Sequence, residues 1–165
     1  MAISTHSSSL LDTQTLSALA NARVAIVYTE WNDSIINAQL EGCERILAQF
    51  DAKVAGKYAV PGAFELPFGC RRIWERLREL DGAPEAIIAF GAVIRGGTPH
   101  FDYVCQAATE GILQLNLTLP IPTIFGVLTL DSEAQAWERL GGPHGHKGEE
   151  AALTALKMIA FNRHK

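Results

Sequence analysis

The order of hydrophobic and polar residues alternates along the chain between a period typical of strands and one typical of helices. Short runs rich in apolar and β-branched residues predict four strands, at residues 24–28, 53–60, 86–94 and 123–129. Apolar residues at helical spacing predict the helices that follow them, at residues 35–50, 64–80, 101–119, 132–140 and 149–161. Asn32 or Asp33 is the expected cap of the first helix, and Asp131 or Ser132 that of the fourth.

This alternation predicts an α/β fold, a three-layer α/β/α sandwich on a four-stranded parallel sheet with right-handed crossovers. The run at residues 86–94 is apolar on both faces, as expected of a central strand that helices cover on both sides. In the second helix we expect Trp74, Leu77 and Leu80 to face the core, and we expect Gly141-Gly142-Pro143 to end the fourth helix in a loop. A chain of 165 residues has room for one domain, which we place at residues 22–165 after a flexible tail at residues 1–21.

Composition and charge narrow the class of protein. Hydrophobic residues make up 48% of the chain and charged residues 19%, which is enough apolar material for a folded core. The net charge is −4 and charges of both signs are interspersed, so we expect no nucleic-acid partner and no binding to an anionic membrane. The longest apolar run falls well short of the ~20 residues that a membrane-spanning helix needs.

The cysteines and the N-terminal segment favour a cytoplasmic protein. Cys43, Cys70 and Cys105 are widely spaced and odd in number, which fits a reducing compartment better than a disulfide framework. The N-terminal segment has neither the basic start nor the apolar core of a signal peptide. His144 and His146 lack a third ligand at a suitable spacing, so we expect no metal site.

The candidate chemistry lies in the segments that follow the strands, because ligands of open parallel sheets bind beyond the carboxyl ends of the strands. Gly96-Gly97-Thr98 precedes a predicted helix, so its backbone N–H groups and the Thr98 hydroxyl can bind an anion. The alternative is a tight turn that needs glycine for a positive φ. The chain has no Gly-Lys-Ser/Thr loop and no GxGxxG motif in its first crossover, which disfavours ATP and dinucleotides.

Five side chains in such segments have both a functional and a structural interpretation. His100 can act as a general base or proton shuttle, or it can be a helix-capping or surface histidine. Trp31 can stack on a planar ring or fill the core, and Glu65 can accept a hydrogen bond from a substrate or simply favour a helix start. Arg139 and Lys147, which flank a late glycine-rich segment, can meet an anion or be ordinary exposed charges.

Taken together, these segments resemble the 6,7-dimethyl-8-ribityllumazine synthase family. The matching segments are WNDSI at 31–35, VPGAFELP at 60–67, GAVIRGGTPHFDYV at 91–104, FGVLT at 125–129, ER at 138–139 and GHKG at 145–148. The resemblance covers about residues 22–160, and the segment at 91–104 is long enough to be highly specific. It implies a flavodoxin-like fold, in agreement with the alternation of strands and helices.

The resemblance also implies an activity and a set of site residues. The expected reaction condenses 5-amino-6-(D-ribitylamino)uracil with 3,4-dihydroxy-2-butanone 4-phosphate to give 6,7-dimethyl-8-ribityllumazine, phosphate and water, the penultimate step of riboflavin biosynthesis, without a metal or an organic cofactor. His100 is the expected catalytic proton shuttle. The aminouracil is expected at Trp31, Ala63, Phe64, Glu65, Val93 and Ile94 together with Phe125 of a neighbouring subunit, and the phosphate at Gly97, Thr98, Arg139 and Lys147.

The same resemblance implies a homopentamer. The length of the segment between Arg139 and Lys147 matches that of shell-forming relatives and favours twelve pentamers in a 60-subunit shell, with riboflavin synthase as a candidate partner. Two other functions remain open, an archaeal-type riboflavin synthase that dismutates lumazine and a non-catalytic lumazine- or flavin-binding shell protein. The complete segments around Ala63 and Thr98 disfavour the first alternative, and the joint presence of His100 and Arg139 disfavours the second.

Overall fold

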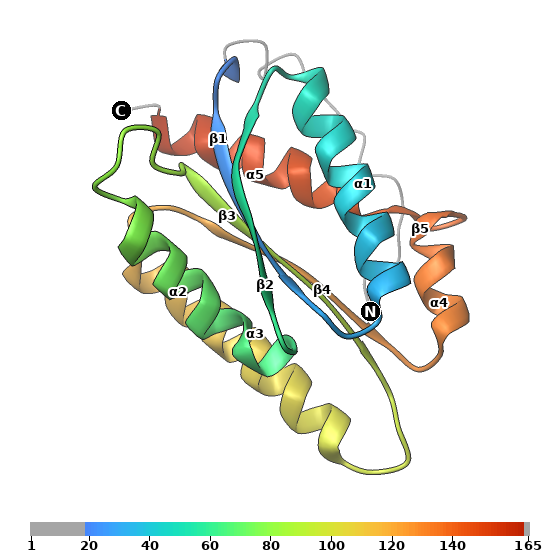
Figure 1. The fold of residues 1–165 in the computed structure, drawn as a ribbon. Coiled ribbons are helices and arrows are strands. Elements are labelled where there is room, and N and C mark those ends of the chain that lie inside the picture. Colours follow the sequence, from blue (N-terminus) through green and yellow to red (C-terminus); the bar gives the residue numbers. More distant parts are fainter. Residues whose placement is uncertain (1–18, 164–165) are drawn as a thin grey trace.

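The computed structural model describes residues 19–163, so most of the predicted tail, residues 1–18, lies outside the described residues. The elements follow one another as the sequence predicts, with two small additions (Figure 1). In chain order they are β1 (Arg23–Thr29), α1 (Asp33–Gln49), β2 (Lys53–Val60), the short 3-10 helix η2 (Ala63–Glu65), α2 (Leu66–Leu77), β3 (Ala86–Ile94), α3 (His100–Thr118), β4 (Thr123–Leu130), α4 (Glu133–Glu138), β5 (Leu140–Gly142), β6 (Gly145–His146) and α5 (Lys147–Arg163).

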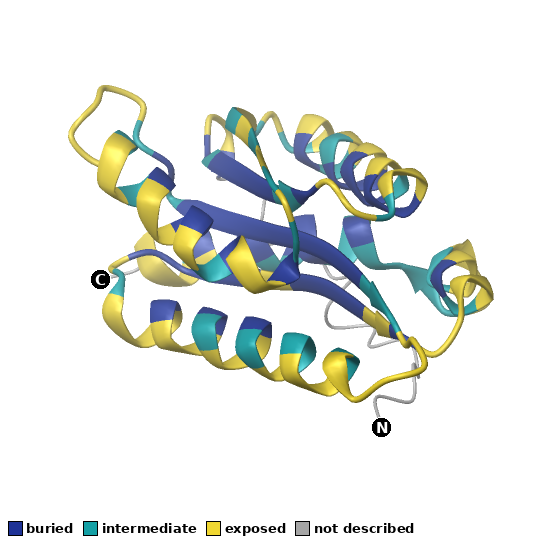
Figure 2. Ribbon diagram, turned by 60° about the horizontal axis from the view of Figure 1, so that its bottom comes forward, coloured by how far each residue is buried: buried dark blue, intermediate teal, exposed yellow. Residues whose placement is uncertain are grey.

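The main sheet has four strands in the order β2-β1-β3-β4, and every neighbouring pair is parallel. Helices α1 and α5 cover one face of the sheet, and α2 and α3 cover the other (Figure 1). Figure 2 shows the buried sheet between helices whose outer sides are exposed. The predicted three-layer α/β/α sandwich is therefore confirmed.

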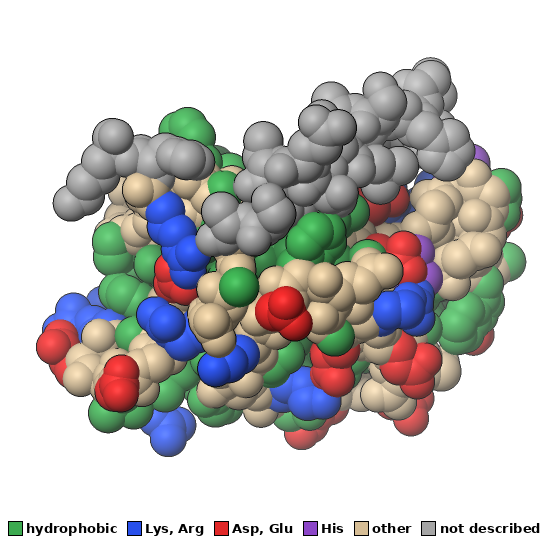
Figure 3. All heavy atoms as spheres, turned by 90° about the horizontal axis from the view of Figure 1, so that it is seen from above, with side chains coloured by type: hydrophobic (Ala, Val, Ile, Leu, Met, Phe, Trp, Pro, Cys, Tyr) green, Lys and Arg blue, Asp and Glu red, His purple; other side chains and the backbone are tan. Residues whose placement is uncertain are grey.

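Alternation along the strands divides the core into two apolar clusters, one on each face of the sheet. In β1, Val24 and Ile26 join the cluster under α1 and α5, whereas Ala25 and Val27 join the cluster under α2 and α3. Strand β3 is buried on both faces in the same way, because successive side chains of a strand point to opposite sides. On the face seen in Figure 3, cationic and anionic side chains are interspersed among hydrophobic ones.

Three features of the described chain differ from the prediction. Helix α2 ends at Leu77, and Leu80 lies in the following turn with 58% of its surface exposed, because the chain reverses through Gly82 at φ 87°. The glycine-rich segment after α4 is a small antiparallel sheet, β5–β6, and not a loop. Gly141 and Gly145 make its tight reversal possible at φ 108° and 76°, and α5 then begins at Lys147, earlier than predicted.

Candidate active site

A hollow of about 520 Å³ lies beyond the carboxyl ends of β1, β2 and β3 and is called here the strand-end hollow. It is the position where an open parallel sheet binds its ligands. Seven of the predicted site residues line it, together with Asn32, Gly62, Ala92 and Val104. These seven are Trp31, Ala63, Phe64, Glu65, Val93, Ile94 and His100.

One wall of the strand-end hollow combines an aromatic ring with a carboxylate. Trp31 follows β1 with 72% of its surface exposed, so the core interpretation of this side chain is excluded. Gly62 lies between the two groups, since a Cβ placed on it would be 3.1 Å from Glu65 Oε2 and 3.6 Å from Trp31 Cδ1. The turn η2 thus brings a hydrogen-bond acceptor beside a flat apolar surface.

Asn32 joins this wall to the central strand. Its backbone is left-handed, with φ 60° and ψ 49°, and it occupies the N-cap position of α1. The predicted side-chain cap is not made by Asn32, because its Nδ2 donates instead to the Ala92 carbonyl oxygen at 2.9 Å. The carboxylate of Asp33 accepts the adjacent Ser34 N–H at 2.9 Å.

The floor of the hollow is an overhang of β3. Pairing between β1 and β3 ends at Tyr28 and Phe90, whereas β3 and β4 stay paired as far as Ile94 and Leu130. The edge of residues 91–94 that faces β1 is therefore outside the β1 ladder, and the Ala92 carbonyl on this edge already accepts the Asn32 amide. Backbone groups of this overhang can pair with the polar edge of a ligand.

The loop between β3 and α3 leaves its backbone accessible. Gly96 and Gly97 are exposed, and a Cβ on either would meet no atom within 4 Å. Neither glycine is among the positive-φ residues of the described chain, so the tight-turn interpretation does not explain them. Thr98 and His100 follow at the exposed start of α3, where free N–H groups and the helix dipole favour an anion.

Arg95 fixes both ends of this loop and was not among the predicted site residues. Its Nε donates to Asp131 Oδ1 at 2.9 Å and its Nη1 to Asp102 Oδ1 at 3.1 Å. The guanidinium lies 4.1 Å from the centre of the Phe101 ring. The hydrogen bond to Asp131, followed by that to Asp102, raises the pKa of Arg95 above its ordinary value.

Arg139, Lys147 and Phe125 lie outside the strand-end hollow. Pairing of β5 with β6 brings the first two together, with Lys147 N–H donating to the Arg139 carbonyl at 2.8 Å. The Arg139 guanidinium donates to the Gln135 carbonyl at 3.1 Å, and Lys147 Nζ donates to Glu150 Oε2 at 2.7 Å. The predicted site residues therefore fall into separate groups within one chain.

Phe125 and Lys147 line a second hollow of about 490 Å³, called here the edge hollow. It runs along β4, an edge strand, beside α5. Phe125 is 42% exposed there although it belongs to a strand that is otherwise mostly buried. An exposed aromatic residue on an edge strand is available to a neighbouring molecule.

Other reactive groups of the described chain do not form a competing site. Burial raises the pKa of both the Cys43 and the Cys70 thiol to about 12, so neither is a nucleophile near neutral pH. Cys105 is half-buried, and desolvation also raises its pKa. Within residues 19–163, no three His, Cys, Asp or Glu side chains form a group that could hold a metal ion. No helix in this range is long and apolar enough to cross a membrane.

Comparison with known proteins identifies the family. A sequence model of 6,7-dimethyl-8-ribityllumazine synthase matches residues 21–163. The enzyme of that name from Parabacteroides distasonis is 48% identical over 141 residues, which cover 84% of this chain and 85% of the relative. Those from Phocaeicola vulgatus and Kocuria rhizophila are each 42% identical, covering 98% and 93% of this chain and 94% and 95% of the relatives. The chain therefore belongs to the 6,7-dimethyl-8-ribityllumazine synthase family.

Proposed function

We propose that this protein condenses 5-amino-6-(D-ribitylamino)uracil with 3,4-dihydroxy-2-butanone 4-phosphate to give 6,7-dimethyl-8-ribityllumazine, phosphate and water, in riboflavin biosynthesis. The proposal rests on the strand-end hollow, which gathers an exposed aromatic ring, a carboxylate and an imidazole. Membership of the family, with relatives that bear this enzyme's name, favours condensation over lumazine dismutation or a non-catalytic shell.

We place the aminouracil against Trp31 in the strand-end hollow. The exposed indole supplies a stacking surface for a planar pyrimidine. On the overhang of β3, the backbone of Ile94 faces the β1 side and can pair with the polar edge of the ring, and Val93 lines the hollow beside it. Ala63, Phe64 and Glu65 belong to the turn η2, whose carboxylate can accept hydrogen bonds from the ribityl hydroxyls.

We place the phosphate of the second substrate at the loop between β3 and α3. Gly97 offers an unobstructed backbone, and Thr98 adds a hydroxyl at the start of a long helix. His100 begins α3 two residues after Thr98 and lines the strand-end hollow, which supports a role for its imidazole at both proposed substrate positions.

The chemistry consists of proton transfers between two positioned substrates. Schiff-base formation, phosphate elimination, enolisation and ring closure each move a proton on or off carbon, nitrogen or oxygen. His100 can carry these protons, including those that accompany loss of the two water molecules, one in Schiff-base formation and one in ring closure. Holding both substrates in one hollow supplies much of the remaining acceleration.

We infer that a neighbouring subunit completes each site in a homopentamer. Phe125 and Lys147 lie in the edge hollow and Arg139 lies in neither hollow, so none of them reaches the strand-end hollow of its own chain. A ring in which the edge strand of one subunit meets the strand-end hollow of the next brings a guanidinium and an ammonium to the phosphate. Association of twelve pentamers into a 60-subunit shell is the larger assembly that we propose.

An assay with both substrates tests the proposed function. Lumazine absorbance and released phosphate, followed together on protein sized by light scattering, are expected to rise in equal amounts. Incubation with lumazine alone is expected to give no riboflavin. Absence of lumazine from an assembled protein supplied with both substrates contradicts the proposal, and riboflavin from lumazine alone favours the dismutating alternative.

A further inference from the structure

Arg95 bridges two carboxylates that flank the proposed phosphate loop. Asp131 directly follows β4, and Asp102 lies in the first turn of α3, two residues after His100. Both carboxylates are exposed, and Arg95 makes an ion pair with each, at 2.9 Å and 3.1 Å. Two uncompensated negative charges at this place would repel an incoming phosphate, which is itself an anion.

We propose that Arg95 is a positioning residue that neutralises Asp102 and Asp131 and thereby keeps the loop at residues 96–100 receptive to the phosphorylated substrate. This inference rests on the proposed function, because it concerns the loop to which the phosphate is assigned. Arg95 acts through the loop and its flanking carboxylates, and Gly97, Thr98 and His100 remain the groups that meet the substrate.

Arginine is suited to this task because its guanidinium can address two partners at once. Nε donates to the carboxylate after β4 and Nη1 to the carboxylate of α3, while Cζ lies over the Phe101 ring, 4.1 Å from its centre. The Arg95 backbone N–H donates to the Leu130 carbonyl at 2.8 Å, which fixes the start of the loop to the end of β4. A lysine can approach only one carboxylate with good geometry and has no such fork.

Because these ion pairs are exposed, we expect them to affect the binding of phosphate more than the stability of the fold. Exposed ion pairs contribute little to folding stability, so the network is not explained as a stabilising device. The same exposure lets the carboxylates act on ions that approach from solvent. We therefore expect removal of Arg95 to change phosphate affinity much more than thermal stability.

Kinetics of charge-altered variants test the inference. Arg95→Gln is expected to raise KM for the butanone phosphate about tenfold at roughly 0.02 M ionic strength and only about twofold at roughly 0.5 M, because salt screens the repulsion. KM for the aminouracil is expected to stay within about twofold. Adding Asp102→Asn and Asp131→Asn to Arg95→Gln is expected to restore KM for the phosphate substrate to within about threefold of the original protein. Arg95→Lys, which keeps the charge, is expected to fall between the original protein and Arg95→Gln.

A matched control removes another exposed arginine. Arg78→Gln breaks an ion pair with Glu79 at the end of α2 that is remote from the strand-end hollow, and it is expected to change neither KM. Light scattering on every variant verifies that the assembly is unchanged. A triple variant that binds the phosphate substrate as weakly as Arg95→Gln overturns the inference, as does an unchanged KM in Arg95→Gln.

Binding of inorganic phosphate separates this inference from the proposed function. Calorimetry with inorganic phosphate, in the absence of both substrates, is expected to show that Arg95→Gln binds phosphate more weakly than the original protein. The triple variant is expected to recover the original affinity for phosphate. If the original protein forms no lumazine but this pattern holds, the proposed function fails and the role of Arg95 stands. If lumazine forms but the pattern is absent, the role of Arg95 fails and the function stands.

Discussion

The strand-end hollow and the edge hollow differ in how the fold assembles them. The strand-end hollow collects residues from successive crossovers, since the parallel strands β1, β2 and β3 all end at the same side of the sheet. The edge hollow lies along the single strand β4, with an exposed Phe125 and the ion pair between Lys147 and Glu150. A parallel sheet gathers strand ends within one chain, whereas Phe125, midway along the edge strand β4, lies in the edge hollow, where we propose that a neighbouring subunit meets it.

Removal of the imidazole is the change with the largest expected effect on the strand-end hollow. His100→Ala is expected to lower kcat roughly a hundredfold, at the lower end of the range for acid–base catalysis, because substrate positioning remains intact. Steady-state kinetics with both substrates at saturating concentrations measures this fall in kcat. The matched control is His144→Ala, which removes a half-exposed imidazole outside both hollows and is expected to leave kcat unchanged. An unchanged rate in His100→Ala would remove this residue from the mechanism.

Removal of the Arg139 guanidinium tests whether a neighbouring subunit contributes to binding of the phosphate. Arg139→Ala is expected to weaken use of the phosphorylated substrate by about 2 kcal/mol, typical of a hydrogen bond to a charged group. This corresponds to roughly a thirtyfold rise in KM for that substrate. KM for the aminouracil is expected to change little. A collapse of aminouracil affinity, with the phosphate substrate unaffected, would show that the phosphate has been placed wrongly.

Substitution of the aromatic wall has a smaller expected effect. Trp31→Ala is expected to lose about 1 kcal/mol of stacking energy, which corresponds to a roughly fivefold rise in KM for the aminouracil. Trp31→Phe, which keeps a stacking ring, is expected to remain within about twofold. Quenching of tryptophan fluorescence on addition of aminouracil, compared with the Trp31→Phe protein, reports the contact directly. Equal KM values for all three proteins would exclude stacking on this side chain.

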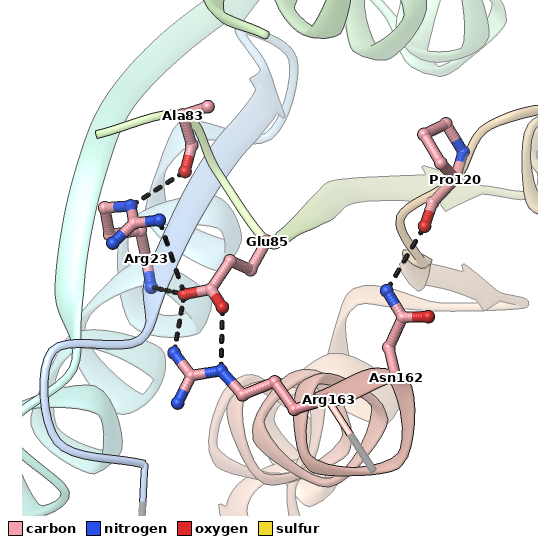
Figure 4. A network of polar contacts seen from close by, with 6 residues as sticks. All are labelled: Arg23, Ala83, Glu85, Pro120, Asn162 and Arg163. Carbon is pink, nitrogen blue, oxygen red and sulfur yellow. Dashed lines mark hydrogen bonds and ion pairs between the residues drawn. The ribbon is translucent and has the colours of Figure 1, made fainter. Parts of the chain in front are cut away.

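A carboxylate network at the amino ends of the strands, opposite the strand-end hollow, offers a substitution that leaves both hollows unchanged. The Glu85 carboxylate accepts hydrogen bonds from Nε and Nη2 of Arg163, each at 2.8 Å, and from the Arg23 backbone N–H at 3.1 Å (Figure 4). Burial by itself would raise the pKa of Glu85, but the bonds from Arg163 and Arg23 outweigh it and hold that pKa below its ordinary value.

Because the folded pKa of Glu85 is depressed, the stability it contributes is present above its unfolded pKa of about 4.3 and is lost as pH falls through the folded value. Glu85→Gln is expected to lower the free energy of unfolding by about 1 kcal/mol at pH 7 and to have less effect in acid. Denaturant unfolding at neutral and acidic pH measures this difference. A cost of Glu85→Gln that does not shrink in acid, or a changed KM for either substrate, would contradict it.

The fold and much of the strand-end hollow could be predicted from the sequence because local patterns determine them. The apolar run of β3 and the helical spacing of α1 predict the layers of the fold. The rule that ligands bind beyond the strand ends predicts Trp31, Glu65 and His100 as residues of the hollow. The proximity of Trp31 to Glu65 around Gly62 depends on strand register, which no single segment contains.

Other features could not be predicted because their causes are not local. Arg95 was missed because its partners lie 7 and 36 residues away, one in α3 and one directly after β4. The small sheet β5–β6 was missed because glycines hide the period of a strand, so Gly141 and Gly142 were interpreted as a helix stop only. The Asn32 side chain was expected to cap a helix but donates to the Ala92 carbonyl of β3, which lies beside it only in the folded sheet.

Co-assembly of two defective subunits tests most directly the claim that residues of two neighbouring subunits, His100 of one and Arg139 of the next, form one site. Equal amounts of His100→Ala and Arg139→Ala protein, dissociated and reassembled together, are expected to recover about a quarter of the original activity when the butanone phosphate is held well below its KM, where both separate variants are nearly inactive. In a ring with heterologous contacts, that share of sites pairs an intact His100 with an intact Arg139 from the next subunit. Activity no greater than the sum of the two separately assembled variants would contradict a shared site.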